Sequence, residues 1–123
     1  MKSPSFFRSL RHAWRGLVLG WKTERNFRVH IVAAILVIFA CLFFPLSKVE
    51  RLVLLIVVMF VLVLELLNSC VERVVDLLKP RLDEYVKDVK DLMAGAVLIA
   101  SLFALMIALI IFWPLFFSLM KFV

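Results

Sequence analysis

The sequence predicts an all-α membrane protein, in which an N-terminal amphipathic surface helix precedes three transmembrane helices. Hydrophobic residues make up 65% of the 123 residues and the mean hydropathy is +1.08, whereas soluble domains are roughly 45–50% apolar. Three stretches, residues 29–47, 52–64 and 92–120, contain no Lys, Arg, Asp or Glu. With 3 glycines and 4 prolines, the composition also excludes a disordered or collagen-like chain.

The first expected element is a surface helix over about residues 5–22. Its apolar positions recur at intervals of three and four, while the basic positions fall between them: apolar Phe6, Phe7, Leu10, Trp14, Leu17, Val18 and Trp21, and basic Arg8, Arg11 and Arg15. This pattern is typical of a helix that lies in the headgroup layer. Ser3 and Pro4 are candidates for its N-cap and first helical residue. The pattern leaves open whether the helix is an anchor or one wall of an interfacial site.

Three transmembrane spans follow, over about residues 29–47, 51–71 and 92–116, and the whole chain, 1–123, is expected to form one domain. A helical span needs about 20 mostly apolar residues. The second span reaches that length with one acid inside it, Glu65. The third carries alanines at four-residue spacing, namely Ala96, Ala100, Ala104 and Ala108. Such a stripe favours close helix packing or oligomerisation.

The distribution of Lys and Arg predicts the orientation in the membrane. Seven precede the first span and five lie between the second and third, whereas two lie between the first and second and one follows the third. Basic residues accumulate on the cytoplasmic side of membrane proteins. We therefore expect the amino terminus and the 72–91 connection in the cytoplasm. The long basic stretch before the first apolar run is not typical of a cleavable signal peptide.

The main functional signal is a stripe of polar residues on the second span. Glu65, Asn68, Glu72 and Asp76 are spaced by 3, 4 and 4 residues, so they lie within about 80° of one another on a helix. An ionisable group at membrane depth costs at least ~2.5–3.5 kcal/mol on insertion scales. Hydrogen bonding to a neighbouring helix explains a lone Asn better than four aligned polar residues. The stripe predicts a polar site entered from the cytoplasm.

Two more charged clusters are expected at the same level. Glu24 is the one acid among the first 49 residues, and Lys90 and Asp91 open the third span. Each has a structural alternative, since Glu24 can pair with Arg28 at i+4 and Asp91 can favour a helix start. Together with the stripe, these carboxylates suit Mg²⁺ shared with substrate phosphates. The chain has neither GxxxxGK[ST] nor GxGxxG, so spacing alone does not indicate ATP.

Three blocks resemble the small prokaryotic diacylglycerol kinase family. The stripe, Glu65-Leu-Leu-Asn68-Ser-Cys-Val-Glu72-Arg-Val-Val-Asp76, is similar to the family signature E-[IL]-[IL]-N-[ST]-A-[IV]-E-x-V-V-D. The other blocks are Glu24-Arg25-Asn26-Phe27-Arg28-Val29-His30 and Lys90-Asp91-Leu-Met-Ala94-Gly95-Ala96-Val97-Leu98. The resemblance implies a lipid kinase of the bacterial inner membrane that uses ATP and Mg²⁺. It also implies a homotrimer with active sites shared between subunits.

The resemblance further implies roles for individual residues. Glu65 is the expected general base for the lipid hydroxyl, and Asn68 is expected to position the reacting groups. Glu24 and Glu72 are the expected Mg²⁺ ligands. The expected ATP-binding residues are His12, Glu24, Glu72, Asp76, Lys90 and Asp91, with His12 where the family often has an aromatic residue. The expected contacts to the lipid substrate are Trp14, Asn26, Arg28, Glu65 and Ala94.

The acceptor lipid stays open between two candidates. The Glu24–His30 block and the Leu109–Pro114 ending look like the undecaprenol kinase branch, whereas the diacylglycerol branch tends to have an acid at the position of His30. Undecaprenol, giving undecaprenyl phosphate, is therefore favoured over diacylglycerol, giving phosphatidic acid. A small proton-coupled transporter using Glu65, and an oligomeric scaffold using the alanine stripe, are alternatives of other classes. No nucleic-acid partner is expected.

Overall fold

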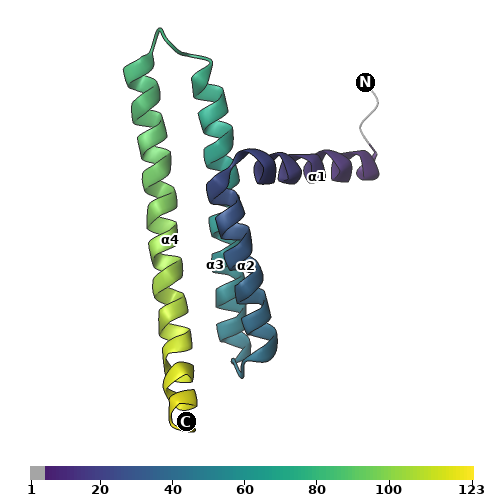
Figure 1. Cartoon of the computed structure of the whole chain (residues 1–123). Coiled ribbons are helices and arrows are strands. Elements are labelled where there is room, and N and C mark those ends of the chain that lie inside the picture. Colours follow the sequence, from purple (N-terminus) through teal and green to yellow (C-terminus); the bar gives the residue numbers. More distant parts are fainter. Residues whose placement is uncertain (1–4) are drawn as a thin grey trace.

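The computed structural model describes residues 5–123 and contains four helices: α1 (Phe6–Thr23), α2 (Arg25–Phe43), α3 (Lys48–Asp76) and α4 (Asp83–Met120). Helix α3 packs against both α2 and α4, while α1 projects sideways from the start of α2 (Figure 1). Helices α2, α3 and α4 are each long and apolar enough to cross a membrane. The prediction of an all-α membrane protein with three long apolar helices is therefore confirmed.

Helices α1 and α2 are separated by a single residue, Glu24. The start of α1 is capped by Ser5, whose Oγ accepts a hydrogen bond from the Arg8 backbone N–H at 3.4 Å. Ser3 and Pro4, the candidates for this role, lie outside the described residues. Glu24 has an extended backbone, with φ −115° and ψ 109°, and so ends one helix and begins the next. This residue therefore turns the chain from α1 into α2.

The turn between α2 and α3 follows from Pro45 and Ser47. Helix α2 ends at Phe43, before the apolar run ends, because a residue that precedes proline is restricted to extended conformations. Phe44 accordingly has φ −94° and ψ 150°. Ser47 and Glu50 then form a capping box, with the Glu50 N–H donating to Ser47 Oγ at 3.1 Å and the Ser47 N–H to Glu50 Oε1 at 3.0 Å. The helix thus covers 25–43, where the apolar run indicated 29–47.

Helices α3 and α4 continue past their apolar segments at the opposite end. Helix α3 extends to Asp76 and α4 begins at Asp83, beyond the expected boundaries at 71 and 92. Asp83 and Glu84 in the first turn of α4 favour a helix start there. The charged residues of this end therefore stand on regular helices that face each other.

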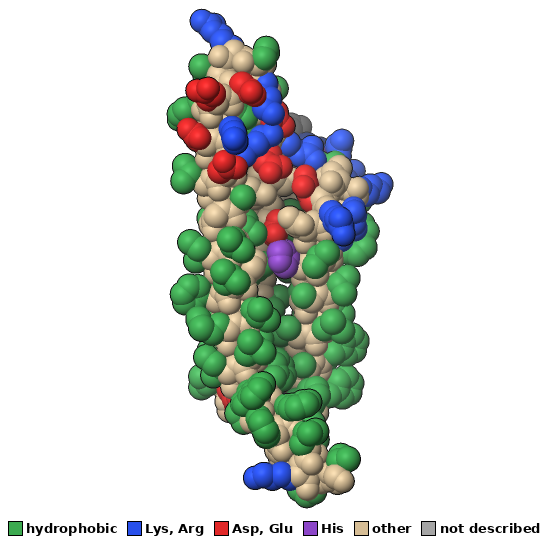
Figure 2. Space-filling model, turned by 60° about the vertical axis from the view of Figure 1, so that its left-hand side comes forward, with side chains coloured by type: hydrophobic (Ala, Val, Ile, Leu, Met, Phe, Trp, Pro, Cys, Tyr) green, Lys and Arg blue, Asp and Glu red, His purple; other side chains and the backbone are tan. Residues whose placement is uncertain are grey.

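The three packed helices, α2, α3 and α4, form a three-helix stack whose two ends differ in composition. A small core of Cys41, Leu46, Leu54 and Ile111 closes the end where α2 turns into α3. Most charged side chains gather at the other end, and hydrophobic side chains cover most of the remaining surface in view (Figure 2). Many large hydrophobic side chains of α2, α3 and α4 point outward, as suits helices that face lipid.

Candidate functional site

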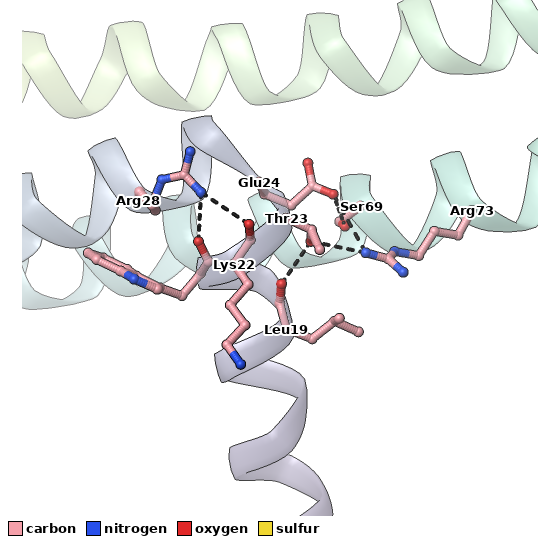
Figure 3. A network of polar contacts seen from close by, with 8 residues as sticks. Leu19, Lys22, Thr23, Glu24, Arg28, Ser69 and Arg73 are labelled. Atoms are coloured by element: carbon pink, nitrogen blue, oxygen red, sulfur yellow. Dashed lines mark hydrogen bonds and ion pairs between the residues drawn. The ribbon is translucent and has the colours of Figure 1, made fainter.

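A polar network fixes the joint between α1, α2 and α3 (Figure 3). Ser69 Oγ donates to Glu24 Oε1 at 2.8 Å, which links the joint to α3. Arg73 Nη2 donates to Thr23 Oγ1 at 3.0 Å and lies 4.0 Å from Glu24 Oε1. Thr23 Oγ1 in turn donates to the Leu19 carbonyl at 2.7 Å. The network therefore directs the Glu24 carboxylate toward the polar face of α3.

Arg28 stabilises the end of α1 and does not pair with Glu24. Its Nη1 donates to the backbone carbonyl oxygens of Trp21 at 2.8 Å and Lys22 at 3.3 Å. Carbonyls in the last turn of a helix lack intrahelical partners, and the helix dipole favours a cation there. The i+4 pairing of Glu24 with Arg28 is therefore wrong, because both side chains have better partners across the joint.

Gly20 allows α1 to approach α2 and α3 closely at this joint. A Cβ at Gly20 would lie 3.1 Å from Leu66 Cδ2 and 3.2 Å from the ring of Phe27. Phe27 is itself only 2% exposed. The C-terminal end of α1 is thus held by packing at Gly20 and by the hydrogen bonds around Glu24.

Glu65 is a buried carboxylate in contact with a histidine from the facing helix. The residue is 4% exposed, and its Oε1 lies 2.9 Å from His30 Nδ1. The two atoms are at ion-pair distance from each other, and neither has a hydrogen bond to any other described residue. Asn68 Oδ1 and Ser101 Oγ are buried without partners as well. Buried polar atoms left without partners cost about 1–3 kcal/mol each, so their clustering makes this place the candidate site.

A pocket of about 300 Å³ opens beside Glu65 between α2, α3 and α4. Its polar lining comes from Asn26 and His30 on α2, Glu65 on α3, and Ser101 on α4. Ala94 lines the same pocket. Three of the residues expected to contact the lipid, Asn26, Glu65 and Ala94, are therefore brought together.

A second pocket, of about 270 Å³, lies at the charged end, between the α3–α4 connection and the first turns of α4. It is lined by Lys79, Asp83, Lys87, Lys90 and Asp91. Three ammonium groups and two carboxylates thus face one space, and the lysines provide charge that complements phosphates. The expected nucleotide residues Lys90 and Asp91 both lie here.

Asp76 joins this pocket to the polar stripe. Its Oδ1 lies 2.6 Å from Lys90 Nζ and 3.8 Å from Lys79 Nζ. Both aspartate and lysines stand beyond the apolar segments of their helices. The hydrogen bond from Lys90 lowers the pKa of the Asp76 carboxyl, and the same bond raises the pKa of Lys90. Both groups therefore stay charged throughout the neutral pH range.

The remaining carboxylates border the polar face of α3. Glu72 follows Glu65 by seven residues on that helix, and Glu24 accepts the hydrogen bond from Ser69. The stripe therefore leads from the charged pocket, past Glu72 and Asn68, to the buried Glu65.

Comparison with known proteins identifies the family. Residues 11–112 match the family described as "Prokaryotic diacylglycerol kinase". The chain belongs to this family. It is 37% identical over 109 residues to an undecaprenol kinase of Bacillus subtilis, covering 89% of each chain. It is also 37% identical over 119 residues to a diacylglycerol kinase of Synechocystis, covering 96% of this chain and 68% of the relative. A diacylglycerol kinase of Escherichia coli is 33% identical over 102 residues, covering 83% of this chain and 84% of the relative.

Membership of the prokaryotic diacylglycerol kinase family confirms the resemblance and the prediction of a lipid kinase. A lipid kinase of this family uses ATP as its phosphate donor and a membrane lipid as its acceptor. The two pockets differ in their chemistry: one combines a buried carboxylate with apolar walls, and the other is rich in lysine.

Not every expected site residue of the kinase lies near the pockets. His12 and Trp14 stand in the middle of α1, which projects away from the three-helix stack (Figure 1). Trp14 is 68% exposed. Arg28, another expected lipid contact, directs its guanidinium to the end of α1. Within one chain, these three residues are not brought together with Glu65.

The structure also adds residues that the sequence analysis missed. Ser69 and Arg73 follow Glu65 at i+4 and i+8, so they lie on nearly the same face of α3 as the polar stripe. Helical spacing alone could therefore have included them. Lys79 and Lys87 precede Lys90 in the same basic connection. Lys87 and Lys90 share one face of α4 with Asp83, so helical spacing could have grouped them, whereas the place of Lys79 depends on the α3–α4 connection.

Proposed function

We propose that this lipid kinase transfers the γ-phosphate of ATP, with Mg²⁺, to the hydroxyl of undecaprenol, giving undecaprenyl phosphate. The observation that carries the proposal is the buried Glu65 carboxylate, which lines a pocket between α2, α3 and α4 and whose Oε1 contacts His30 Nδ1 at 2.9 Å. The similarity of the Glu24–His30 block to the undecaprenol kinase branch favours undecaprenol. A relative named undecaprenol kinase supports it.

Glu65 acts as the general base in this proposal. It takes the proton of the lipid hydroxyl as the hydroxyl oxygen attacks the γ-phosphorus. The bond from that phosphorus to its bridging oxygen breaks, and ADP leaves. Asn68, one turn along α3 with its Oδ1 buried and unpartnered, positions the reacting groups.

Glu24 and Glu72 are proposed to hold Mg²⁺. The described residues contain no group of three or more His, Cys, Asp or Glu side chains placed to bind a metal. Two carboxylates nevertheless fit this ion, which is commonly bound by one or two carboxylates together with substrate phosphates and water. Ser69 and Arg73 orient the Glu24 carboxylate. When bound, Mg²⁺ neutralises charge on the phosphates.

The charged pocket is proposed to bind the nucleotide. Lys90 neutralises phosphate charge while Asp76 holds its ammonium in place at 2.6 Å. Asp91 borders the same pocket. Lys79 and Lys87 add positive charge there. Positioning and charge neutralisation supply much of the catalysis of phosphoryl transfer, so a glycine-rich loop is not required.

The residues of α1 join the site through membrane placement and assembly. We propose that α1 lies in the cytoplasmic headgroup layer of the bacterial inner membrane, with the amino terminus in the cytoplasm. In a homotrimer with shared active sites, His12, Trp14 and Arg28 contribute to nucleotide and lipid binding that one chain alone does not complete. The surface helix and the three spans form one functional domain.

The test measures phosphate transfer from γ-labelled ATP to lipid by the purified protein in mixed micelles. Undecaprenol and diacylglycerol are offered separately, with and without Mg²⁺. We expect Mg²⁺-dependent labelling of undecaprenol over diacylglycerol. A preference for diacylglycerol would reassign the acceptor and leave the phosphoryl-transfer mechanism in place. Labelling of neither lipid, by folded protein that binds ATP, would overturn the proposed function.

A further inference from the structure

Arg73 reaches from α3 to the joint between α1 and α2. Its Nη2 donates to Thr23 Oγ1 at 3.0 Å and lies 4.0 Å from Glu24 Oε1. Figure 3 shows the side chain extended from α3 toward these two residues. In the stripe that resembles the family signature, Arg73 stands at the position that the signature leaves variable, so the resemblance assigns it no role. Its role therefore has to follow from its surroundings in this chain.

The contacts at the joint use only a small part of the Arg73 guanidinium. Among the described residues both contacts are made by Nη2, although the group has five N–H donors. The side chain is 52% exposed, and an exposed ion pair contributes little to stability. Arg28 differs, because its Nη1 donates to two carbonyl oxygens at the end of α1. The other donors of Arg73, and most of its charge, are therefore available to an anion.

The neighbours of Arg73 on α3 are residues proposed to bind the metal and the nucleotide. Glu72 precedes it directly, and Asp76 follows at i+3, about one helical turn away. Asp76 Oδ1 lies 2.6 Å from Lys90 Nζ. Arg73 and Lys90 thus bring positive charge to the same end of α3 from two directions. A chain of phosphates that contacts Lys90 has a second cation one turn away at Arg73.

The Arg73 guanidinium also influences any cation bound by Glu24. Because Nη2 lies 4.0 Å from Glu24 Oε1, a Mg²⁺ ion on this carboxylate would be repelled by the guanidinium. A phosphate group removes this repulsion, since its oxygens bind Mg²⁺ and also accept paired hydrogen bonds from arginine. The metal and the phosphate should therefore bind at this joint together, and the metal alone should bind weakly.

We propose that Arg73 contacts a phosphate of the bound nucleotide and makes the binding of Mg²⁺ at Glu24 depend on that nucleotide. Without nucleotide, the guanidinium competes with Mg²⁺ for the Glu24 carboxylate, while Thr23 Oγ1 holds Nη2 at the joint. With nucleotide, the guanidinium binds a phosphate oxygen and leaves Glu24 to the metal. This inference rests on the proposed function, since it requires ATP as the donor and Mg²⁺ on Glu24.

The first test measures metal binding to the purified protein in detergent without nucleotide, using Mn²⁺ as the probe and the EPR signal of the free ion. Arg73→Gln should bind Mn²⁺ several-fold more tightly than the wild type, because the competing charge is gone. Ser69→Ala, which removes the hydrogen bond that orients Glu24, should bind Mn²⁺ more weakly. If Arg73 only orients Glu24, both variants should change in the same direction. Unchanged or weaker Mn²⁺ binding by Arg73→Gln would overturn the inference.

The second test measures ATP binding in the presence of EDTA, by displacement of a fluorescent nucleotide. Arg73→Gln should weaken ATP binding about tenfold, as for the loss of a hydrogen bond to a charged group, so its affinities for metal and nucleotide should change in opposite directions. Equal ATP affinity in Arg73→Gln and the wild type would exclude the phosphate contact. Arg8→Gln, which removes the same charge from the exposed far end of α1, should match the wild type in both tests.

The lipid-labelling assay separates failure of this inference from failure of the proposed function. If the wild type labels neither lipid, the proposed function fails, and this inference fails with it. If the wild type labels lipid and Arg73→Gln matches it in both binding tests, only this inference fails.

Discussion

Two glutamates on α3 are used in opposite ways. Glu50 stands near the start of the helix, where its Oε1 accepts from the Ser47 N–H and its own N–H donates to Ser47 Oγ. Glu65, fifteen residues later, is 4% exposed, and its Oε1 contacts His30 Nδ1 at 2.9 Å and no other hydrogen-bonding group of the described residues. The Glu50 carboxylate stabilises the start of the helix, whereas burial of the Glu65 carboxylate lowers the stability of the fold. A carboxylate that is buried and does not serve to cap its helix therefore points to the site.

The sharpest way to test this contrast is to neutralise each glutamate in turn. We expect Glu65→Gln to lower kcat by about 10²–10⁴-fold, the usual contribution of a general base, because the amide cannot accept the hydroxyl proton. Labelled phosphate transfer to lipid measures this effect. The matched control is Glu50→Gln, which preserves a capping box and should keep wild-type turnover. A fully active Glu65→Gln variant would exclude Glu65 as the base.

The next prediction concerns the network that orients Glu24. Ser69→Ala removes the 2.8 Å hydrogen bond to Glu24 Oε1, and we expect the Mg²⁺ concentration for half-maximal activity to rise about 10–100-fold, as when a partner of a metal ligand is lost. A Mg²⁺ titration of kinase activity measures this change. Ser9→Ala, on the exposed part of α1, serves as the control. An unchanged Mg²⁺ requirement in Ser69→Ala would show that the network is only structural.

A smaller effect is expected at the nucleotide pocket. Lys90→Met should raise the KM for ATP roughly tenfold, since a charge-assisted contact is lost, whereas Lys48→Met at the opposite end of α3 should not. The lowered pKa of Asp76 keeps the ion pair intact until the pH falls through that folded-state value, and the raised pKa of Lys90 keeps it until the pH rises through that of the ammonium. The ratio of the KM for ATP of Lys90→Met to that of the wild type should therefore be constant between about pH 6 and 9. A ratio that changes across this range would mean that another group titrates in the pocket.

The contrast between partnered and unpartnered groups also explains how far the sequence alone could go. The three long helices and the stripe of Glu65, Asn68, Glu72 and Asp76 follow from the spacing of residues along a single helix, which needs no knowledge of packing. Contacts between helices were not accessible in this way. The spacing offered Arg28 to Glu24, but did not include the competing carbonyls of Trp21 and Lys22.

Ser101 shows the same limit most clearly. A lone serine in an apolar span has no neighbour in the sequence that marks it, and it lines the same pocket as His30 and Glu65 only because of how α4 packs. His30 stood out in the sequence as a feature of one family branch, yet its 2.9 Å approach to Glu65 depends on the packing of α2 on α3. Residues whose function arises from a single helix face could be predicted, and those whose function arises between helices could not.

The smallest expected effect is a difference in thermal stability between alanine substitutions at the two glycines of α1. Alanine is favoured over glycine within a helix by about 1 kcal/mol, and a Cβ at Gly16 would meet no atom within 4 Å, so Gly16→Ala should raise the thermal midpoint in detergent. At Gly20 the same Cβ would press on Leu66 and the ring of Phe27. Since the buried ring has little room to move, the gain in helix propensity should be cancelled or reversed there. Equal stabilisation by both substitutions would mean that α1 is not held tightly at the joint, and would remove the packing that fixes Glu24 beside α3.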